Sequence, residues 1–197
     1  MKIVYHNGYY FGEARGQIRH GKGTYVWNTG ESYEGDWLND NMHGFGKYRY
    51  DNGDIYEGNF IENEITGNGK CTYGNGSVYV GGWYKGKRAG KGKFIWSDGD
   101  VYEGNFVNDR ITGFGKFTWK QGARAGDIYE GNCFSNNMQG KGKYFFANGD
   151  VYEGDFVNNK EHGNGTLTKA DGTIISGKWE NGVCVENNAP RRKTVNY

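Results

Sequence analysis

Three groups of residues in this sequence are candidates for a ligand-binding or catalytic role: a glycine-rich segment, four histidines and three cysteines. The segment 16–23, Gly-Gln-Ile-Arg-His-Gly-Lys-Gly, approximates a phosphate-binding loop, in which a Ser or Thr after the lysine holds magnesium. Gly23 takes that position here, and a strand pattern follows where the loop needs a helix. The other Gly-x-Gly pairs lack the third glycine of a dinucleotide-binding turn. We therefore expect no nucleotide site.

His20, His43 and His162 each directly precede a Gly-x-Gly, where polar loop residues are typical. His20 and His43 fall in neighbouring hairpins, about 10 Å apart, which is too far to share one metal ion. The three cysteines lie far apart and form no Cys-x-x-Cys pair, so they predict neither a disulfide framework nor a zinc site. We expect no catalytic residue, no metal and no cofactor, and therefore no enzyme.

The composition excludes other classes of protein. The chain has 197 residues, a net charge of +1, one proline and 36 glycines, with 16 tyrosines, 11 phenylalanines and 6 tryptophans. A collagen would carry much more proline, and a nucleic-acid-binding domain would be strongly basic, so we expect no nucleic-acid partner. No apolar run is long enough for a membrane span or a signal peptide. We expect a cytoplasmic protein, with association to the cytoskeleton or to a membrane left open.

A repeat of 23 residues organises nearly the whole chain. Each copy opens with Tyr-x-Gly, carries Gly-x-Gly eleven residues later and in most cases closes with Asn-Gly or Asp-Gly. We predict seven repeats over 10–174, half-repeat caps at 1–9 and 175–185, and a flexible basic tail at 186–197. The repeats start at residues 10, 33, 56, 79, 102, 129 and 152.

Short alternating segments rich in Tyr, Trp, Phe and Val between these turns predict strands, and the glycine density opposes helices. A four-residue turn inside each repeat would place Trp37 opposite Gly44. A three-residue turn between repeats would place Tyr48 opposite Tyr56. One even and one odd turn keep the repeated tyrosines on a single face.

With this register, rings and glycines share one face, and a ladder of glutamates and lysines occupies the other. Aromatic rings can lie over glycines that have no Cβ, and a continuous glycine row is where a sheet bends most easily. We therefore predict an all-β fold: an elongated single-layer antiparallel sheet of repeated 23-residue hairpins, bent into a trough with the rings inside.

The segments Tyr-Glu-Gly-Asp-Trp at 33–37 and Gly-Phe-Gly-Lys-Tyr at 44–48 resemble the MORN repeat, the membrane occupation and recognition nexus motif. The resemblance covers residues 10 to 182. It implies an elongated antiparallel sheet whose groove holds a helix or an extended segment of a partner, often in a scaffolding role. The chain departs from the pattern at Cys71 and Cys133, which stand at aromatic positions.

A single layer has no second sheet to cover its apolar face, so part of the aromatic face should contact a partner. We predict a non-enzymatic protein-interaction scaffold, and the resemblance implies a cytoskeletal, ciliary, flagellar or membrane-associated assembly. Tyrosine and tryptophan are typical anchors of such contacts. The predicted residues of the partner-binding groove are Tyr56, Tyr79, Tyr102, Trp83, Trp96 and Trp119.

Two alternative functions stay open. A peripheral tether to membrane phospholipids is suggested by Lys85, Lys87, Arg88 and Lys91, although the net charge of +1 argues against a broad basic surface. An accessory module of a separate enzyme is the other. The unpaired edges of the end strands also predict a homodimer formed by strand pairing.

Overall fold

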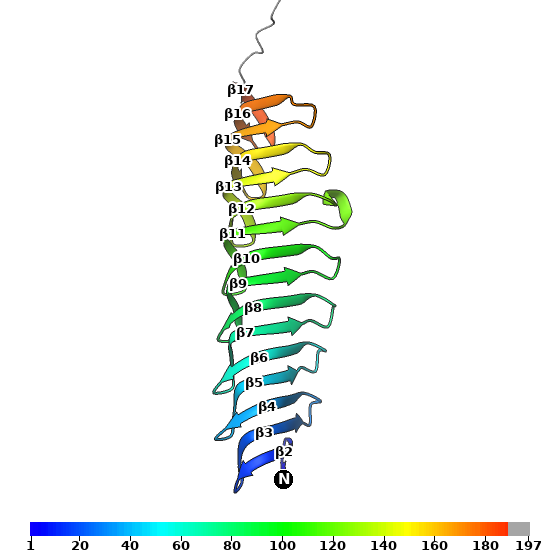
Figure 1. Ribbon diagram of the computed structural model, residues 1–197, viewed down its shortest axis with the longest axis vertical. Helices are drawn as coiled ribbons and strands as arrows, with labels where there is room; N and C mark the ends of the chain where they lie inside the picture. Colours follow the sequence, from blue (N-terminus) through cyan, green and yellow to red (C-terminus); the bar gives the residue numbers. More distant parts are fainter. Residues whose placement is uncertain (189–197) are drawn as a thin grey trace, which may run out of the picture. The chain divides into compact units, whose positions relative to one another are not determined.

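The computed structural model describes residues 1–188, and nearly all of its regular structure is antiparallel strand (Figure 1). The described residues divide into two compact units, residues 1–97 with 105–109 and residues 98–104 with 110–188. Strand β10 (Val101–Val107) contributes residues to both units. The prediction of an all-β array of repeated hairpins is confirmed.

In the first unit each strand pairs with the next strand along the chain. Its strands are β1 (Lys2–Tyr5), β2 (Gly8–Arg15), β3 (Ile18–Trp27), β4 (Ser32–Leu38), β5 (Asn41–Arg49), β6 (Ile55–Ile61), β7 (Glu64–Thr72), β8 (Val78–Tyr84) and β9 (Lys87–Ile95).

The second unit repeats this consecutive pairing from β11 onward. Its strands are β11 (Arg110–Thr118), β12 (Ile128–Phe134), β13 (Asn137–Phe145), β14 (Val151–Val157), β15 (Lys160–Thr168), β16 (Ile174–Glu180) and β17 (Val183–Asn187). The longer spacing between the fifth and sixth repeats accommodates a 3-10 turn at Gly122–Arg124. Of the predicted tail 186–197, Glu186 and Asn187 belong to β17, and 189–197 lies outside the described residues.

Each repeat folds as a hairpin closed by two residues. Asn39 and Asp40 have φ of 48° and 66°, and a two-residue type I′ turn requires positive φ at both positions. Trp37 therefore pairs with Met42 and not with Gly44, so the prediction of a four-residue turn is wrong. Asn and Asp tolerate this backbone conformation better than most residues, which explains why they recur at these tips.

A bulge next to the glycine row restores the repeat length. Gly35 pairs with Gly46, but the adjacent Asp36 pairs with His43, so two extra residues lie on the second strand of the hairpin. The same shift follows the equivalent glycine in other hairpins of both units. A bulged strand bends at the bulge, so each hairpin is bent beside its glycines.

The three-residue turn between repeats has the predicted form. Tyr48 pairs with Tyr56, as expected, and the N–H of Gly53 donates to the carbonyl of Tyr50 (3.2 Å). Gly53 has φ of 86°, a conformation that glycine adopts without strain. This odd turn and the even hairpin turn keep the tyrosines of successive repeats on one face.

Hydrogen bonds tie the hairpin tips of successive repeats together. The Asn63 side chain accepts from the N–H of Met42 (2.8 Å), and the N–H of Asn63 donates to the Met42 carbonyl (3.0 Å). These bonds fix the spacing of adjacent hairpins. The same two bonds join Asp40 to Arg19, Asp109 to Arg88, Asn136 to Ile111 and Asn159 to Met138.

The core is a row of tyrosines that lie flat over opposed glycines. The Tyr56 ring covers Gly58 and Gly69, and a Cβ added at either glycine would overlap the tyrosine ring or its hydroxyl. On its flanks the Tyr56 ring meets Phe60 and Trp83 edge to face, each with ring centroids 5.3 Å apart. Such aromatic pairs stabilise beyond the area that they bury. The tyrosines with 0 % exposure are Tyr10, Tyr33, Tyr56, Tyr79, Tyr102, Tyr129 and Tyr152.

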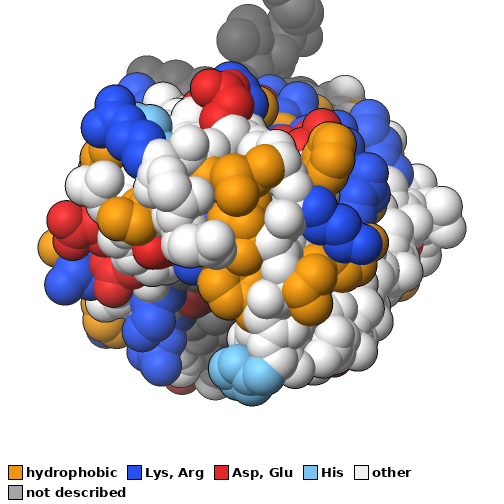
Figure 2. Space-filling view, turned by 90° about the horizontal axis from the view of Figure 1, so that it is seen from below, with side chains coloured by type: hydrophobic (Ala, Val, Ile, Leu, Met, Phe, Trp, Pro, Cys, Tyr) orange, Lys and Arg blue, Asp and Glu red, His pale blue; other side chains and the backbone are white. Residues whose placement is uncertain are grey.

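The opposite face carries the predicted ladder of opposite charges. Lys47 pairs with Glu57 (2.6 Å) and Lys116 with Glu130 (2.8 Å). The hydrogen bond from Lys47 lowers the pKa of Glu57 below its ordinary value. Figure 2 shows hydrophobic side chains exposed among charged ones at the end of the sheet that carries β1 and β2.

Replacing Gly69 by alanine should destabilise the first unit. The new methyl group overlaps the buried Tyr56 ring, and overpacking of this kind costs about 1–3 kcal/mol of unfolding free energy. Asn68→Ala is the matched control, because Asn68 is exposed on the same strand. Denaturant unfolding followed by circular dichroism measures both variants. Equal midpoints for Gly69→Ala and the wild type would refute this role for the glycine.

Candidate functional site

The structure separates the six residues predicted to line the groove into two groups. Tyr56, Tyr79 and Tyr102 have 0 % exposure and Trp83 has 8 %, so these four rings serve the packing between repeats. A partner could contact the three tyrosines only by displacing that packing. Trp96 is half-buried, and the sixth residue, Trp119, is also half-buried.

Trp96 and Trp119 belong to a row of half-buried rings, one in each of six repeats. Each ring stands directly before the turn between repeats, seventeen residues after the first tyrosine of its repeat. After Trp119 this turn is the longer one that contains the 3-10 turn at Gly122–Arg124. In the first unit, Tyr50 packs on Tyr48 with centroids 4.5 Å apart, and Trp27 lies 5.4 Å from the same ring. The ring row, as we call it, consists of Trp27, Tyr50, Tyr73, Trp96, Trp119 and Phe146.

A cavity of about 330 Å³ opens beside the ring row in the first unit. Cys71 lines it at a position where the preceding repeats have Tyr25 and Tyr48 and the next repeat has Phe94. Because the small thiol replaces a ring there, the space that a ring would fill stays empty. The lining also includes Tyr50, Tyr73, Ile65, Arg88, Asp54 and Asp109. We call this space the Cys71 cavity.

Arg88 forms one wall of the Cys71 cavity and is held there by a carboxylate and by aromatic rings. Its Nε donates to the Asp109 carboxylate (3.1 Å), and its guanidinium lies over the rings of Phe94 (5.0 Å) and Phe106 (5.4 Å). Arginine stacks on aromatic faces in this way because it is weakly hydrated. The Arg88 side chain therefore packs on the ring face. Lys91, another residue of the predicted lipid-binding cluster, is exposed on the same strand.

Burial also sets the protonation of groups in the Cys71 cavity. It raises the pKa of the Cys71 thiol to about 11, and the Asp54 carboxylate adds to this effect. Burial likewise raises the pKa of Tyr73 above its ordinary value. The thiol and the phenol are therefore neutral at physiological pH, so the cavity presents a weakly polar floor and no thiolate nucleophile.

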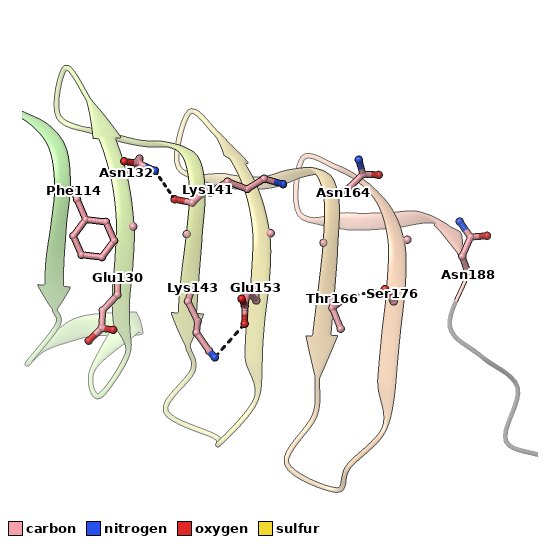
Figure 3. Close-up of a pocket in the computed structure, with 15 residues that line it drawn as sticks. Phe114, Glu130, Asn132, Lys141, Lys143, Glu153, Asn164, Thr166, Ser176 and Asn188 are labelled. Carbon is pink, nitrogen blue, oxygen red and sulfur yellow. Dashed lines mark hydrogen bonds and ion pairs between the residues drawn. The ribbon is translucent and has the colours of Figure 1, made fainter.

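The charged face carries a second hollow, shown for the second unit in Figure 3. Lys143 and Glu153 pair on one side of it (3.1 Å), and the Asn132 amide donates to the Lys141 carbonyl (3.2 Å) on the other. These polar groups satisfy one another, which leaves few directed interactions for a ligand. The volume is about 860 Å³, and the floor is bare backbone at Gly131, Gly142, Gly154, Gly165 and Gly177.

The glycine-rich segment, the histidines and the cysteines do not come together in one site. The glycine-rich segment 16–23 forms a turn and the beginning of β3, with no helix after it. His20 lies within β3 and His43 within β5, so the two histidines belong to different hairpins, and neither stands in the loop that the sequence had indicated. Within residues 1–188 there is no group of three or more His, Cys, Asp or Glu side chains that could hold a metal ion, and no helix long and apolar enough to cross a membrane.

A family model described as MORN repeat matches seven consecutive segments of the chain. Each segment starts at the tyrosine that opens a repeat, and the resemblance noted from the sequence is confirmed. The matched segments are 10–32, 33–55, 56–78, 79–101, 102–124, 129–151 and 152–174.

A comparison with solved structures finds matches of low sequence identity. The TCP domain of Drosophila melanogaster SAS-4, in complex with a proline-rich motif of Ana2, has a TM-score of 0.50 at 12% identity, over 81% of this chain and 84% of that chain. The TCP10 domain of Danio rerio CPAP, in complex with a STIL peptide, has a TM-score of 0.39 at 12% identity, over 86% and 83%. No curated protein sequence matches this chain.

Raising the pH should ionise the buried tyrosines and unfold the sheet together. Burial raises the pKa of Tyr79 to about 12 from the ordinary value of 10.0, although the Arg88 guanidinium lowers it. Because the folded-state pKa is the higher one, the stabilisation is complete below pH 10 and is lost as the pH rises toward 12. Tyrosinate absorbance and circular dichroism should therefore change in one transition. Ionisation of every tyrosine near pH 10 with the sheet intact would contradict this.

Proposed function

The chain belongs to the MORN repeat family, and from this premise we propose that it is a non-enzymatic scaffold that binds an extended segment of a partner protein on its ring face. The contact surface is the ring row together with the Cys71 cavity. A cytoskeletal, ciliary, flagellar or membrane-associated assembly is the setting that we propose for it.

The observation that carries the proposal is the partial exposure of the ring row. The tyrosines below it are completely buried, whereas Tyr50 and Tyr73 keep part of their rings exposed beside a cavity. Rigid aromatic side chains that are apolar on the face and polar at the tip are favoured anchors of protein interfaces. Packing on neighbouring rings holds Tyr50 in place before a partner arrives, which lowers the entropy cost of binding.

An extended partner fits this surface better than a small molecule does. The Cys71 cavity, at about 330 Å³, is near the lower limit of small-molecule sites, which span about 300–1,000 Å³. The ring row continues beyond the cavity through Trp27 on one side and Trp96 on the other within the first unit. A polypeptide can contact several of these rings at once.

One solved structure gives this proposal a precedent in a similar fold. The SAS-4 domain is in complex with a proline-rich motif of Ana2. At 12% identity that similarity concerns the fold, so the residues proposed here rest on the geometry of this chain. The tether to phospholipids, the accessory role beside an enzyme and the homodimer through the end strands stay predictions.

Partner proteins captured from a cell extract by the immobilised chain should be lost in the variant Tyr73→Ala. The sheet should stay folded, because Tyr73 is half-exposed and lies outside the buried tyrosine row. Loss of a central aromatic anchor costs about 2 kcal/mol or more, which is a loss of about 30-fold in affinity. Retained proteins from a cell extract are quantified by mass spectrometry.

Phe45→Ala is the matched control, since Phe45 is 60% exposed on the charged face. A retained set that depends on Tyr73 and not on Phe45 supports the proposal. Dependence on Phe45 alone, or on neither ring, would refute it.

A further inference from the structure

The spacing of the ring row limits the conformation that a bound segment can have. Equivalent rings in successive repeats are separated by two strands, and strands lie about 4.8 Å apart, so the rings recur about every 9.6 Å. In the first unit this holds for Trp27, Tyr50, Tyr73 and Trp96. A segment that contacts each ring in the same way must itself repeat at this distance.

A polyproline II helix has this repeat. It advances about 3.1 Å per residue with three residues per turn, so every third residue faces the same side at intervals of about 9.3 Å. Over three ring intervals the mismatch adds up to about 0.9 Å. Seven residues of an α-helix span about 10.5 Å, so the mismatch over the same distance is about 2.7 Å. In a β-strand, residues i and i+3 face opposite sides, so a three-residue repeat cannot contact the same surface.

The Cys71 cavity supplies an anchoring position within this spacing. It lies between Tyr50 and Tyr73, which are successive members of the ring row. Proline rings dock on aromatic grooves in this manner, because the polyproline II helix is preformed and loses little entropy on binding. The thiol of Cys71, neutral and 5% exposed, gives an apolar ring a weakly polar floor.

The charges beside the ring row define the residues between the prolines. Backbone N–H groups of Trp27 and Tyr50 donate to the carbonyls of Glu31 and Asp54, which places an acidic residue next to these two rings, whereas Tyr73 donates to Ser77. In the cavity itself, the carboxylates of Asp54 and Asp109 outnumber the single guanidinium of Arg88. The surface therefore favours a segment that carries Lys or Arg.

We propose that the ring row of the first unit binds a proline-rich, basic segment in the polyproline II conformation, with prolines three residues apart between successive rings and one of them seated in the Cys71 cavity. This inference rests on the proposed function and adds the chemical class of the partner. It assigns Cys71 a role in specificity, because a ring at this position would close the anchoring site.

The test uses synthetic peptides and fluorescence anisotropy with the full chain. The probe is four copies of Pro-Ala-Arg. One control peptide has the same composition with no two prolines three residues apart, and another replaces Arg by Glu. We expect both controls to bind at least about tenfold more weakly than the probe. If the permuted peptide bound with the same affinity as the probe, the proposed three-residue spacing of the prolines would be overturned. If the Glu peptide bound with the same affinity, the proposed preference for a basic segment would be overturned.

Cys71→Phe tests the anchoring position, since it restores the ring that other repeats carry there. We expect it to weaken probe binding about tenfold or more. Cys133→Phe, a cysteine-to-ring change in the other unit, should leave binding unchanged. Circular dichroism checks the fold of each variant, and Tyr73→Ala replaces Cys71→Phe if that variant does not fold. Unchanged binding in the folded variant would overturn the proposal.

Failure of this inference is distinguishable from failure of the proposed function. Suppose that the wild type retains partners from the extract, that Tyr73→Ala loses them and that the Pro-Ala-Arg probe does not bind. The surface would then bind a segment of another kind. Absence of both would reject the ring face as a binding surface.

Discussion

The contact between a tyrosine ring and two opposed glycines determines the rest of this structure. Gly58 and Gly69 face each other across neighbouring strands, and the ring of Tyr56 lies on the backbone where two side chains would otherwise stand. The ring then contacts Phe60 of its own repeat and Trp83 of the next repeat. One interaction therefore covers the glycine backbone beside the bulge, buries the apolar face of the hairpin and joins each repeat to its neighbour. This explains how a chain poor in aliphatic residues can form a core.

Much of the fold could be predicted from the sequence because its spacing fixes the faces of the strands. Counting residues between tyrosines gave the correct pairing of Tyr48 with Tyr56. The same count paired Trp37 with the wrong residue. A four-residue turn, and a two-residue turn followed by a two-residue bulge, both leave the strand residues beyond them on the same faces of the sheet, so the count cannot distinguish them. Positive φ at Asn39 and Asp40 distinguishes the two, and the Asn-Asp pair was the local signal for it.

The candidate site was less predictable. The ring face was evident from the pattern, but parity alone does not say which of several rings on one face is covered by the others. Tyr79 is covered because glycines beneath it let the ring lie flat, whereas Tyr73 stands at the turn with less around it. Arg88 was grouped with neighbouring lysines in the sequence, and only the structure shows its contacts with Asp109 and with rings. The cavity follows from one departure from the repeat, at Cys71.

The proposed partner segment lies on the ring row and not on the charged face. Intermolecular nuclear Overhauser effects between the Pro-Ala-Arg peptide and the isotope-labelled protein distinguish the two faces. We expect contacts from proline ring protons to the rings of Tyr50 and Tyr73 in the first unit. Contacts confined to Phe45 and the lysines and glutamates of the opposite face would contradict this expectation.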